Sequence, residues 1–178
     1  MNIPNILTVL RIAMIPAFVM TYRMPAYHWS MAIFLAASAT DYLDGHLARK
    51  WNQVTPFGKL MDPLADKLML LTALYCLTDS EHLPAWIFYT MLIKESVMIA
   101  GSVFMLEKKV VVMANWYGKA ATVAFILAVF SVFPWHSITW LAQAGTVMLY
   151  IALAMSILAL VKYTVQAINV KNKVKIDN

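Results

Sequence analysis

Long apolar blocks separated by short polar segments dominate the hydropathy pattern of the chain. We place six such blocks at about 5–22, 29–48, 57–78, 84–106, 116–134 and 138–163. Each is close to the ~20 residues that a helix needs to cross ~30 Å of hydrocarbon. The pattern predicts an all-α integral membrane protein with six transmembrane helices, formed by a single domain over residues 1–178.

Polar and helix-breaking residues at the block ends support these boundaries. Thr55-Pro56 has the character of an N-cap followed by a first-turn proline, which suits the start of the third helix. The polar run 79–82, followed by Pro84, separates the third block from the fourth. Residues 171–178 are polar, and we expect them to form a loose C-terminal tail.

The composition excludes an ordinary soluble domain. Hydrophobic residues make up 62% of the chain and charged residues 13%, whereas soluble domains are about half apolar and a quarter charged. The net charge of +5 suits nucleic acid or anionic lipid. In so apolar a chain, lipid headgroups are the better interpretation, and we expect no nucleic-acid partner.

The distribution of cations predicts the orientation in the membrane. If the N-terminus is cytoplasmic, the opposite loops contain only Arg23, as the positive-inside rule requires. The cytoplasmic loops, helix ends and tail then contain Arg49, Lys50, Lys59, Lys67, Lys108, Lys109, Lys119, Lys162, Lys171, Lys173 and Lys175. We therefore expect a cytoplasmic-membrane protein with both termini, and the site described next, on the cytoplasmic side.

Four aspartates gather at the predicted cytoplasmic ends of the second and third helices. Asp41 and Asp44 share one helix face by their spacing, and Asp62 and Asp66 share another. Repulsion among four carboxylates at membrane depth favours a bound cation. An oxygen-only ligand set suits Mg²⁺ or Mn²⁺, and no Cys/His cluster suggests zinc. The alternative is ion pairing of these carboxylates with nearby arginine and lysine side chains.

Small residues lie beside the carboxylates. Gly45 and Ala48 share the face of the first aspartate pair, and Gly58 lies one turn before Asp62, which leaves space for a ligand near the backbone. Arg49 can bind an anionic group through two hydrogen bonds. A divalent metal and an arginine beside small residues outline a diphosphate site.

The segment from Asp41 to Asp66 resembles the signature of the CDP-alcohol phosphotransferase family, D-x2-D-G-x2-A-R-x8-G-x3-D-x3-D, at all eight fixed positions. The start of the chain resembles the N-x2-T-x2-R opening of its phosphatidylglycerophosphate synthase branch, through Asn5, Thr8 and Arg11. The resemblance implies two metal ions held by Asp41, Asp44, Asp62 and Asp66. It implies that Asp66 is also the general base. It implies a CDP site formed by Gly45, Ala48, Arg49 and Gly58.

The function implied by the resemblance is transfer of the phosphatidyl group of CDP-diacylglycerol to an alcohol. For the phosphatidylglycerophosphate synthase branch the alcohol is glycerol-3-phosphate, and the products are phosphatidylglycerophosphate and CMP. Asp66 would take the proton of the acceptor hydroxyl, which attacks the phosphatidyl phosphorus in line. The implied partners are CDP-diacylglycerol, a small phosphorylated alcohol or phosphatidylglycerol, membrane lipids, and a second copy in a homodimer.

Candidate acceptor-binding residues are Lys94, Lys119 and Arg11. Lys94 and Glu95 lie well inside the fourth apolar block, where an ionisable residue indicates a functional site. The alternative is a structural Lys–Glu contact with a neighbouring helix. Lys119 begins the fifth helix, and the alternative there is an ordinary cytoplasmic flank. Together these cations form a candidate pocket for an acceptor phosphate.

Other functions stay open, and the inositol- and serine-using branches of the family are among them. Bacterial phosphatidylglycerophosphate synthases typically have R-E-F-x2-T-G-x-R in the fourth helix, where this chain has Lys94, Glu95 and Ser102. The K-x2-T pattern of Lys119 also resembles cardiolipin synthases, which accept phosphatidylglycerol. The non-enzyme alternative is a small cation-binding membrane transporter. Crowding of the carboxylates at one membrane face and the lack of a sequence repeat disfavour the transporter.

Overall fold

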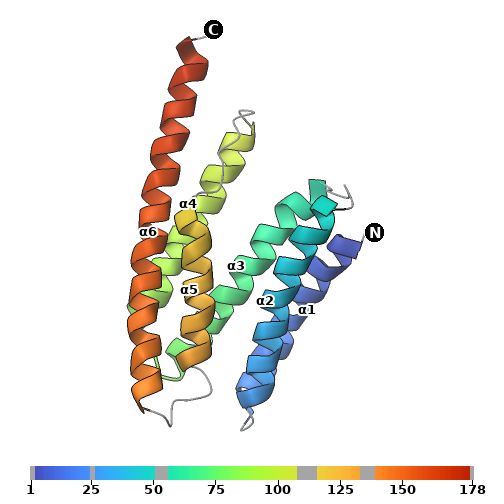
Figure 1. The fold of residues 1–178 in the computed structure, drawn as a ribbon, viewed down its shortest axis with the longest axis vertical. Helices are drawn as coiled ribbons and strands as arrows, with labels where there is room; N and C mark the ends of the chain where they lie inside the picture. The colour runs from blue at the N-terminus through green and yellow to red at the C-terminus, as the bar shows by residue number, and fades with distance from the viewer. Residues whose placement is uncertain (1–2, 25–26, 51–55, 108–115, 133–138, 177–178) are drawn as a thin grey trace.

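The structure is a computed structural model that describes residues 3–24, 27–50, 56–107, 116–132 and 139–176 (Figure 1). Within these ranges all regular secondary structure is helical, which confirms the all-α prediction. The helices are α1 (Ile3–Tyr22), α2 (Tyr27–Lys50), α3 (Pro56–Asp79), α4 (Ala85–Glu107), α5 (Trp116–Val132) and α6 (Thr139–Ile176). Except at the C-terminal end of α6, their bounds lie close to the six predicted apolar blocks, and Pro56 begins α3 as expected.

The C-terminal end of α6 differs from the sequence prediction. This helix has 38 residues and continues to Ile176, so most of the segment expected to be a loose tail is helical. No proline interrupts the segment. Lysines recur in its last turns, where positive charge interacts favourably with the helix dipole.

The helices form two groups that are joined through α3 (Figure 1). Helix α1 packs against α2 and α3, α5 packs against α6, and α3 also contacts α4 and α5. The N-terminal end of α1 and the C-terminal end of α6 are both the upper ends of their helices in this view, although α6 extends much farther. The C-terminal end of α2 and the N-terminal end of α3 are upper helix ends as well. The aspartate-bearing ends of α2 and α3 are thus placed next to each other, at the upper end of the group formed by α1, α2 and α3.

The interior is apolar, and much of the exterior is apolar too. Phe18, Phe34 and Leu149 are buried in the core, whereas Trp29, Ile93 and other large apolar side chains are exposed. In the described part of the chain, the segments Asn5–Tyr22 and Trp140–Gln166 are long and apolar enough to span a membrane. An apolar exterior of this extent suits contact with lipid, so the structure has the character of a membrane protein.

The contact between α5 and α6 depends on a glycine. A Cβ atom built on Gly145 would lie 2.8 Å from Cβ of Ser131 and 2.8 Å from Cγ2 of Val132. Real Cβ atoms do not approach their neighbours so closely, so a larger residue would push the two helices apart. Small residues at helix interfaces allow this close approach in membrane proteins.

Candidate functional site

The predicted metal-binding aspartates lie on two helices that are consecutive in the chain. Asp41 and Asp44 belong to the C-terminal part of α2, and Asp62 and Asp66 belong to the N-terminal half of α3. Both segments have a helical backbone, so each pair keeps the three- or four-residue spacing that puts it on one face. Carboxylates supplied by two neighbouring helix ends are a donor set that fits a hard divalent cation.

Most side chains of this region lie outside the described part of the structure. They include the predicted CDP-binding residues Gly45, Ala48, Arg49 and Gly58, and the predicted metal ligands Asp41, Asp44 and Asp62. The metal and CDP sites therefore stay predictions. Among the side chains that are described, no three metal-ligating residues gather, and of the four aspartates only Asp66 belongs to that set.

The carboxylate of Asp66 lies beside a lysine. Its Oδ2 is 3.7 Å from Nζ of Lys67, and its side chain is 24% exposed. Asp66 also lines a small cavity of about 10 Å³ together with Arg11 and Thr122. The proposed base is thus partly accessible, as a group that exchanges protons with a substrate has to be.

Arg11 is held inside the bundle at the contact between α1 and α2. Its side chain is 1% exposed, and its Nε donates a hydrogen bond of 3.2 Å to the backbone carbonyl of Ala37. Asn5 and Thr8 of the same helix are buried too. The structure places Arg11 on the small cavity with Asp66, and not on the larger cavity that Lys94 lines.

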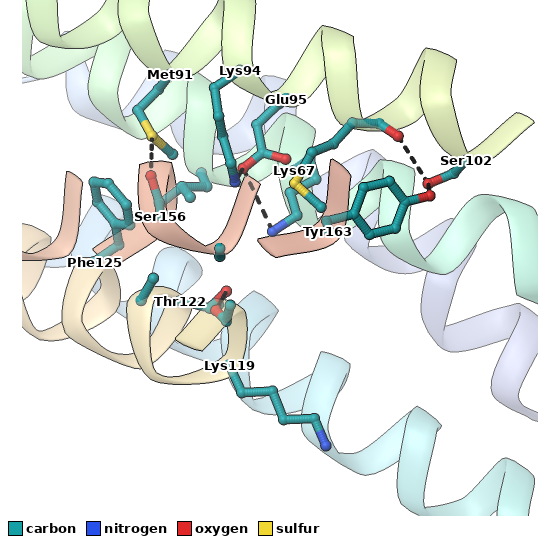
Figure 2. A pocket seen from close by; sticks show the side chains of 15 residues that line it. Lys67, Met91, Lys94, Glu95, Ser102, Lys119, Thr122, Phe125, Ser156 and Tyr163 are labelled. Atoms are coloured by element: carbon teal, nitrogen blue, oxygen red, sulfur yellow. Dashed lines mark hydrogen bonds and ion pairs between the residues drawn. The ribbon is translucent and has the colours of Figure 1, made fainter. Parts of the chain in front are cut away.

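A larger cavity of about 320 Å³ lies between α3, α4, α5 and α6. Its polar and charged lining residues are Lys67, Lys94, Glu95, Ser102, Lys119, Thr122, Ser156 and Tyr163. The structure therefore brings two of the predicted acceptor-binding residues, Lys94 and Lys119, to the same cavity. Figure 2 shows the side chain of Lys119 directed away from the Lys94–Glu95 pair.

Two lysines converge on one buried carboxylate in this cavity (Figure 2). Nζ of Lys94 donates a hydrogen bond of 2.7 Å to Oε1 of Glu95, and Nζ of Lys67 lies 3.7 Å from the same oxygen. Glu95 is only 2% exposed. The helix-to-helix contact considered as an alternative for this pair is therefore present, because Glu95 of α4 pairs with Lys67 of α3.

A pair of hydroxyl groups links α4 to α6 at the same cavity. The hydroxyl of Ser102 donates to the Met98 carbonyl at 2.8 Å. Oγ of Ser102 lies 3.0 Å from the phenolic oxygen of Tyr163. If Ser102 donates to Met98, Tyr163 donates to Ser102, and the phenolic oxygen keeps its lone pairs for a ligand.

Sequence reasoning missed part of this cavity. Lys67 directly follows Asp66 in the sequence. A lysine beside carboxylates is expected to neutralise their charge, so its position alone does not indicate a role in binding. The position of Glu95 inside an apolar block marks it as unusual, but the sequence assigns it no role. Tyr163 is far from the motif in sequence and carries no pattern that marks it.

Comparison with known proteins assigns the fold family. The model of the CDP-alcohol phosphatidyltransferase family matches residues 1–170. The chain belongs to this family. The resemblance seen in the aspartate motif is thereby confirmed, and the matched range includes every predicted site residue.

Several bacterial members of the CDP-alcohol phosphatidyltransferase family are similar over nearly their whole length. The chain is 35% identical over 173 residues to the CDP-diacylglycerol–glycerol-3-phosphate 3-phosphatidyltransferase of Escherichia coli, covering 91% of this chain and 92% of that protein. Proteins of the same name from Shigella sonnei and Salmonella typhimurium match with the same identity and coverage.

Proposed function

We propose that the protein transfers the phosphatidyl group of CDP-diacylglycerol to glycerol-3-phosphate and releases CMP. The observation that carries the proposal is the 35% identity, over 91% of the chain, to relatives named for this reaction. The complete aspartate motif on α2 and α3 supports it. The cavity supports it too, because about 320 Å³ is within the ~300–1,000 Å³ of small-molecule sites.

The ends of α2 and α3 are proposed to bind the diphosphate of the donor. Asp41, Asp44, Asp62 and Asp66 would hold two Mg²⁺ or Mn²⁺ ions. These ions, when bound, neutralise charge on the diphosphate and on the leaving CMP. Arg49 pairs with the diphosphate, and the small residues Gly45, Ala48 and Gly58 let the CDP group approach the backbone.

Asp66 is proposed to accept the proton of the acceptor hydroxyl. The hydroxyl oxygen forms a bond to the phosphatidyl phosphorus as the bond from that phosphorus to the CMP oxygen breaks. The electron pair of the broken bond leaves with CMP, and the proton stays on Asp66 until solvent takes it. A base in this role has to reach within ~2.6–3.2 Å of the hydroxyl oxygen, and the partly exposed carboxylate of Asp66 permits this approach.

The cavity of about 320 Å³ between α3, α4, α5 and α6 is proposed to bind the acceptor. Lys94 and Lys119 place positive charge in the lining of this cavity. A phosphorylated alcohol is an anion, and its phosphate binds to positively charged side chains. Arg11 lies on the neighbouring small cavity beside Asp66. From that position it would act through the surroundings of Asp66 rather than on the acceptor phosphate.

The proposal also includes the topology of the protein. Six helices span the membrane, and the site and both termini lie on the cytoplasmic side. The start of α1 and the end of α6 are both upper helix ends in Figure 1, and this is the side that the cation pattern assigns to the cytoplasm. Lys108 and Lys109 of that pattern lie outside the described residues. The homodimer implied by the family resemblance also stays a prediction.

An acceptor panel tests the proposed function. Purified protein is given CDP-diacylglycerol and Mg²⁺, and CMP release is measured with glycerol-3-phosphate, with phosphatidylglycerol and without an acceptor. We expect CMP release to depend on glycerol-3-phosphate. Release with phosphatidylglycerol alone would replace this function with cardiolipin synthesis. No release with any acceptor, from protein that binds the metal, would favour the transporter alternative.

A further inference from the structure

We propose that Lys67 is a second ligand of the acceptor phosphate, and that the buried carboxylate of Glu95 positions Lys67 and Lys94 to hold that phosphate together. This inference rests on the proposed function, and it adds two residues to the acceptor site. Both residues line the cavity of about 320 Å³, and they come from different helices, α3 and α4.

The contacts of Lys67 leave its hydrogen-bond donors available to a ligand. Its Nζ is 3.7 Å from Oδ2 of Asp66 and 3.7 Å from Oε1 of Glu95. Both distances are longer than a hydrogen bond, so these ion pairs hold the ammonium group in place without using its N–H donors. The side chain is 23% exposed and can be reached from the cavity.

The charges of the cluster favour an anion. Lys67 and Lys94 share the carboxylate of Glu95, and these three residues of the cavity lining together carry one net positive charge, whereas Asp66, the other neighbour of Lys67, lines the small cavity instead. Lys119 on the same cavity adds another. A phosphate monoester carries a charge of about −1.5 to −2 at neutral pH, and its three oxygens can accept hydrogen bonds from two ammonium groups at once. The charge at the cavity therefore matches the phosphorylated end of the acceptor.

The position of Lys67 also suits the reaction geometry. Its ammonium group is equally close to the cavity carboxylate of Glu95 and to the proposed base, Asp66. A phosphate bound at Lys67 is thus separated from Asp66 by a short distance. In a three-carbon alcohol phosphate, only a few bonds separate the phosphate from the far hydroxyl. This length is enough for the hydroxyl to reach Asp66 while the phosphate stays at Lys67. Holding the phosphate here orients the attacking hydroxyl toward the base.

Glu95 accounts for the alignment of the two lysines. Two ammonium groups in a partly buried cavity repel each other, and Lys94 is only 8% exposed. The Glu95 carboxylate, which is almost completely buried, holds both groups through the same oxygen before a ligand arrives. Such preorganisation lowers the entropy lost on binding. Glu95 does not have to touch the substrate and is a positioning residue.

Lys67→Met is the decisive variant, because it keeps an unbranched side chain and removes the charge. With CDP-diacylglycerol saturating, we expect the KM for glycerol-3-phosphate to rise about ten- to a hundred-fold, the usual effect of losing a hydrogen bond to a charged group. The donor KM stays within about two-fold, and Lys67→Arg restores much of the acceptor affinity. Lys162→Met, which removes an exposed lysine of α6 that lines neither cavity, is the matched control.

Glu95→Gln separates positioning from a merely structural role. The amide keeps the shape and loses the charge that aligns the lysines, so the acceptor KM rises by several-fold while kcat changes less. A fall in kcat with unchanged acceptor KM would overturn the positioning role. An unchanged acceptor KM in folded Lys67→Met would overturn the role of Lys67.

Thermal stabilisation by glycerol-3-phosphate provides a measurement that needs no turnover. The ligand is expected to raise the Tm of the wild type by mass action, and to have little effect on Lys67→Met, which CDP-diacylglycerol still stabilises. Equal stabilisation of the two proteins by glycerol-3-phosphate would contradict the inference. Stabilisation of the wild type without any CMP release would instead contradict the proposed function alone. No stabilisation of the wild type would contradict both.

Discussion

Two polar regions meet on α3, and they are built in different ways. The carboxylate region consists of the facing ends of α2 and α3, and its eight motif positions follow one another between Asp41 and Asp66. The cavity region combines residues from α3, α4, α5 and α6 that are far apart in sequence. Asp66 and Lys67 are neighbours in the chain, and each belongs to a different region. The proposed donor chemistry belongs to the carboxylate region and the proposed acceptor binding to the cavity region, and the two regions join at these two residues.

Removal of divalent metal should have the largest effect, and it acts on the carboxylate region. Excess chelator is expected to abolish CMP release, because four aspartates without a cation repel one another and leave the diphosphate charge unneutralised. Mg²⁺ or Mn²⁺ should restore the activity. Thermal unfolding in chelator distinguishes loss of the site from loss of the fold. Full activity in protein whose metal content is shown to be nil would rule out the metal site.

Asp66→Asn tests the residue at the junction of the two regions. The amide has the shape of the carboxylate but cannot accept the proton, so turnover should fall by roughly 10²-fold or more. Binding of CDP-diacylglycerol should persist. Asp79→Asn, the same change at the opposite end of α3, is the matched control and should leave turnover unchanged. A collapse of donor binding in Asp66→Asn would make Asp66 chiefly a metal ligand.

Lys94→Ala and Lys119→Ala test the cavity region. Loss of an ion pair to a phosphate costs about 1.5–3 kcal/mol, so the acceptor KM should rise about ten- to a hundred-fold in Lys94→Ala, with the donor KM little changed. Lys119 is exposed and directed away from the Lys94–Glu95 pair (Figure 2). Its loss should have the smaller effect.

Steady-state kinetics with glycerol-3-phosphate varied measures both lysine variants. Lys94→Ala leaves Glu95 with one partner fewer, so its fold has to be checked by thermal unfolding. Lys119→Ala carries no such complication. An unchanged acceptor KM in folded Lys119→Ala would remove that residue from the acceptor site.

Gly145→Ala should have the smallest effect on activity, because it changes packing outside both polar regions. The new methyl group would overlap Ser131 and Val132 of α5, and overpacking of this kind costs about 1–3 kcal/mol. The Tm should fall while the acceptor KM stays the same. At Gly101 an added Cβ meets only Cε1 of Tyr163, at an ordinary 3.7 Å. Gly101→Ala is therefore the matched control, and equal Tm values for the two variants would contradict the packing account.

The two regions were also predictable to different degrees. The helix bounds, apart from the end of α6, and the aspartate motif could be predicted because both are local. An apolar block encodes a helix, and spacing along a helix determines which residues share a face. Lys94 and Glu95 could be found because charge is conspicuous inside an apolar block. The pairing of Glu95 with Lys67 could not be predicted, since it depends on how α3 packs against α4. Tyr163 lies in α6, about 60 residues beyond its partner Ser102, and no local pattern marks it.

Identification of the lipid product tests the central claim most directly. The purified protein, CDP-diacylglycerol, glycerol-3-phosphate and Mg²⁺ are incubated together, and the lipids and CMP are quantified by mass spectrometry. We predict phosphatidylglycerophosphate in a one-to-one ratio with CMP, and no product when glycerol-3-phosphate is omitted. CMP accompanied by phosphatidic acid, or by no new lipid that contains the acceptor, would contradict the proposed transfer.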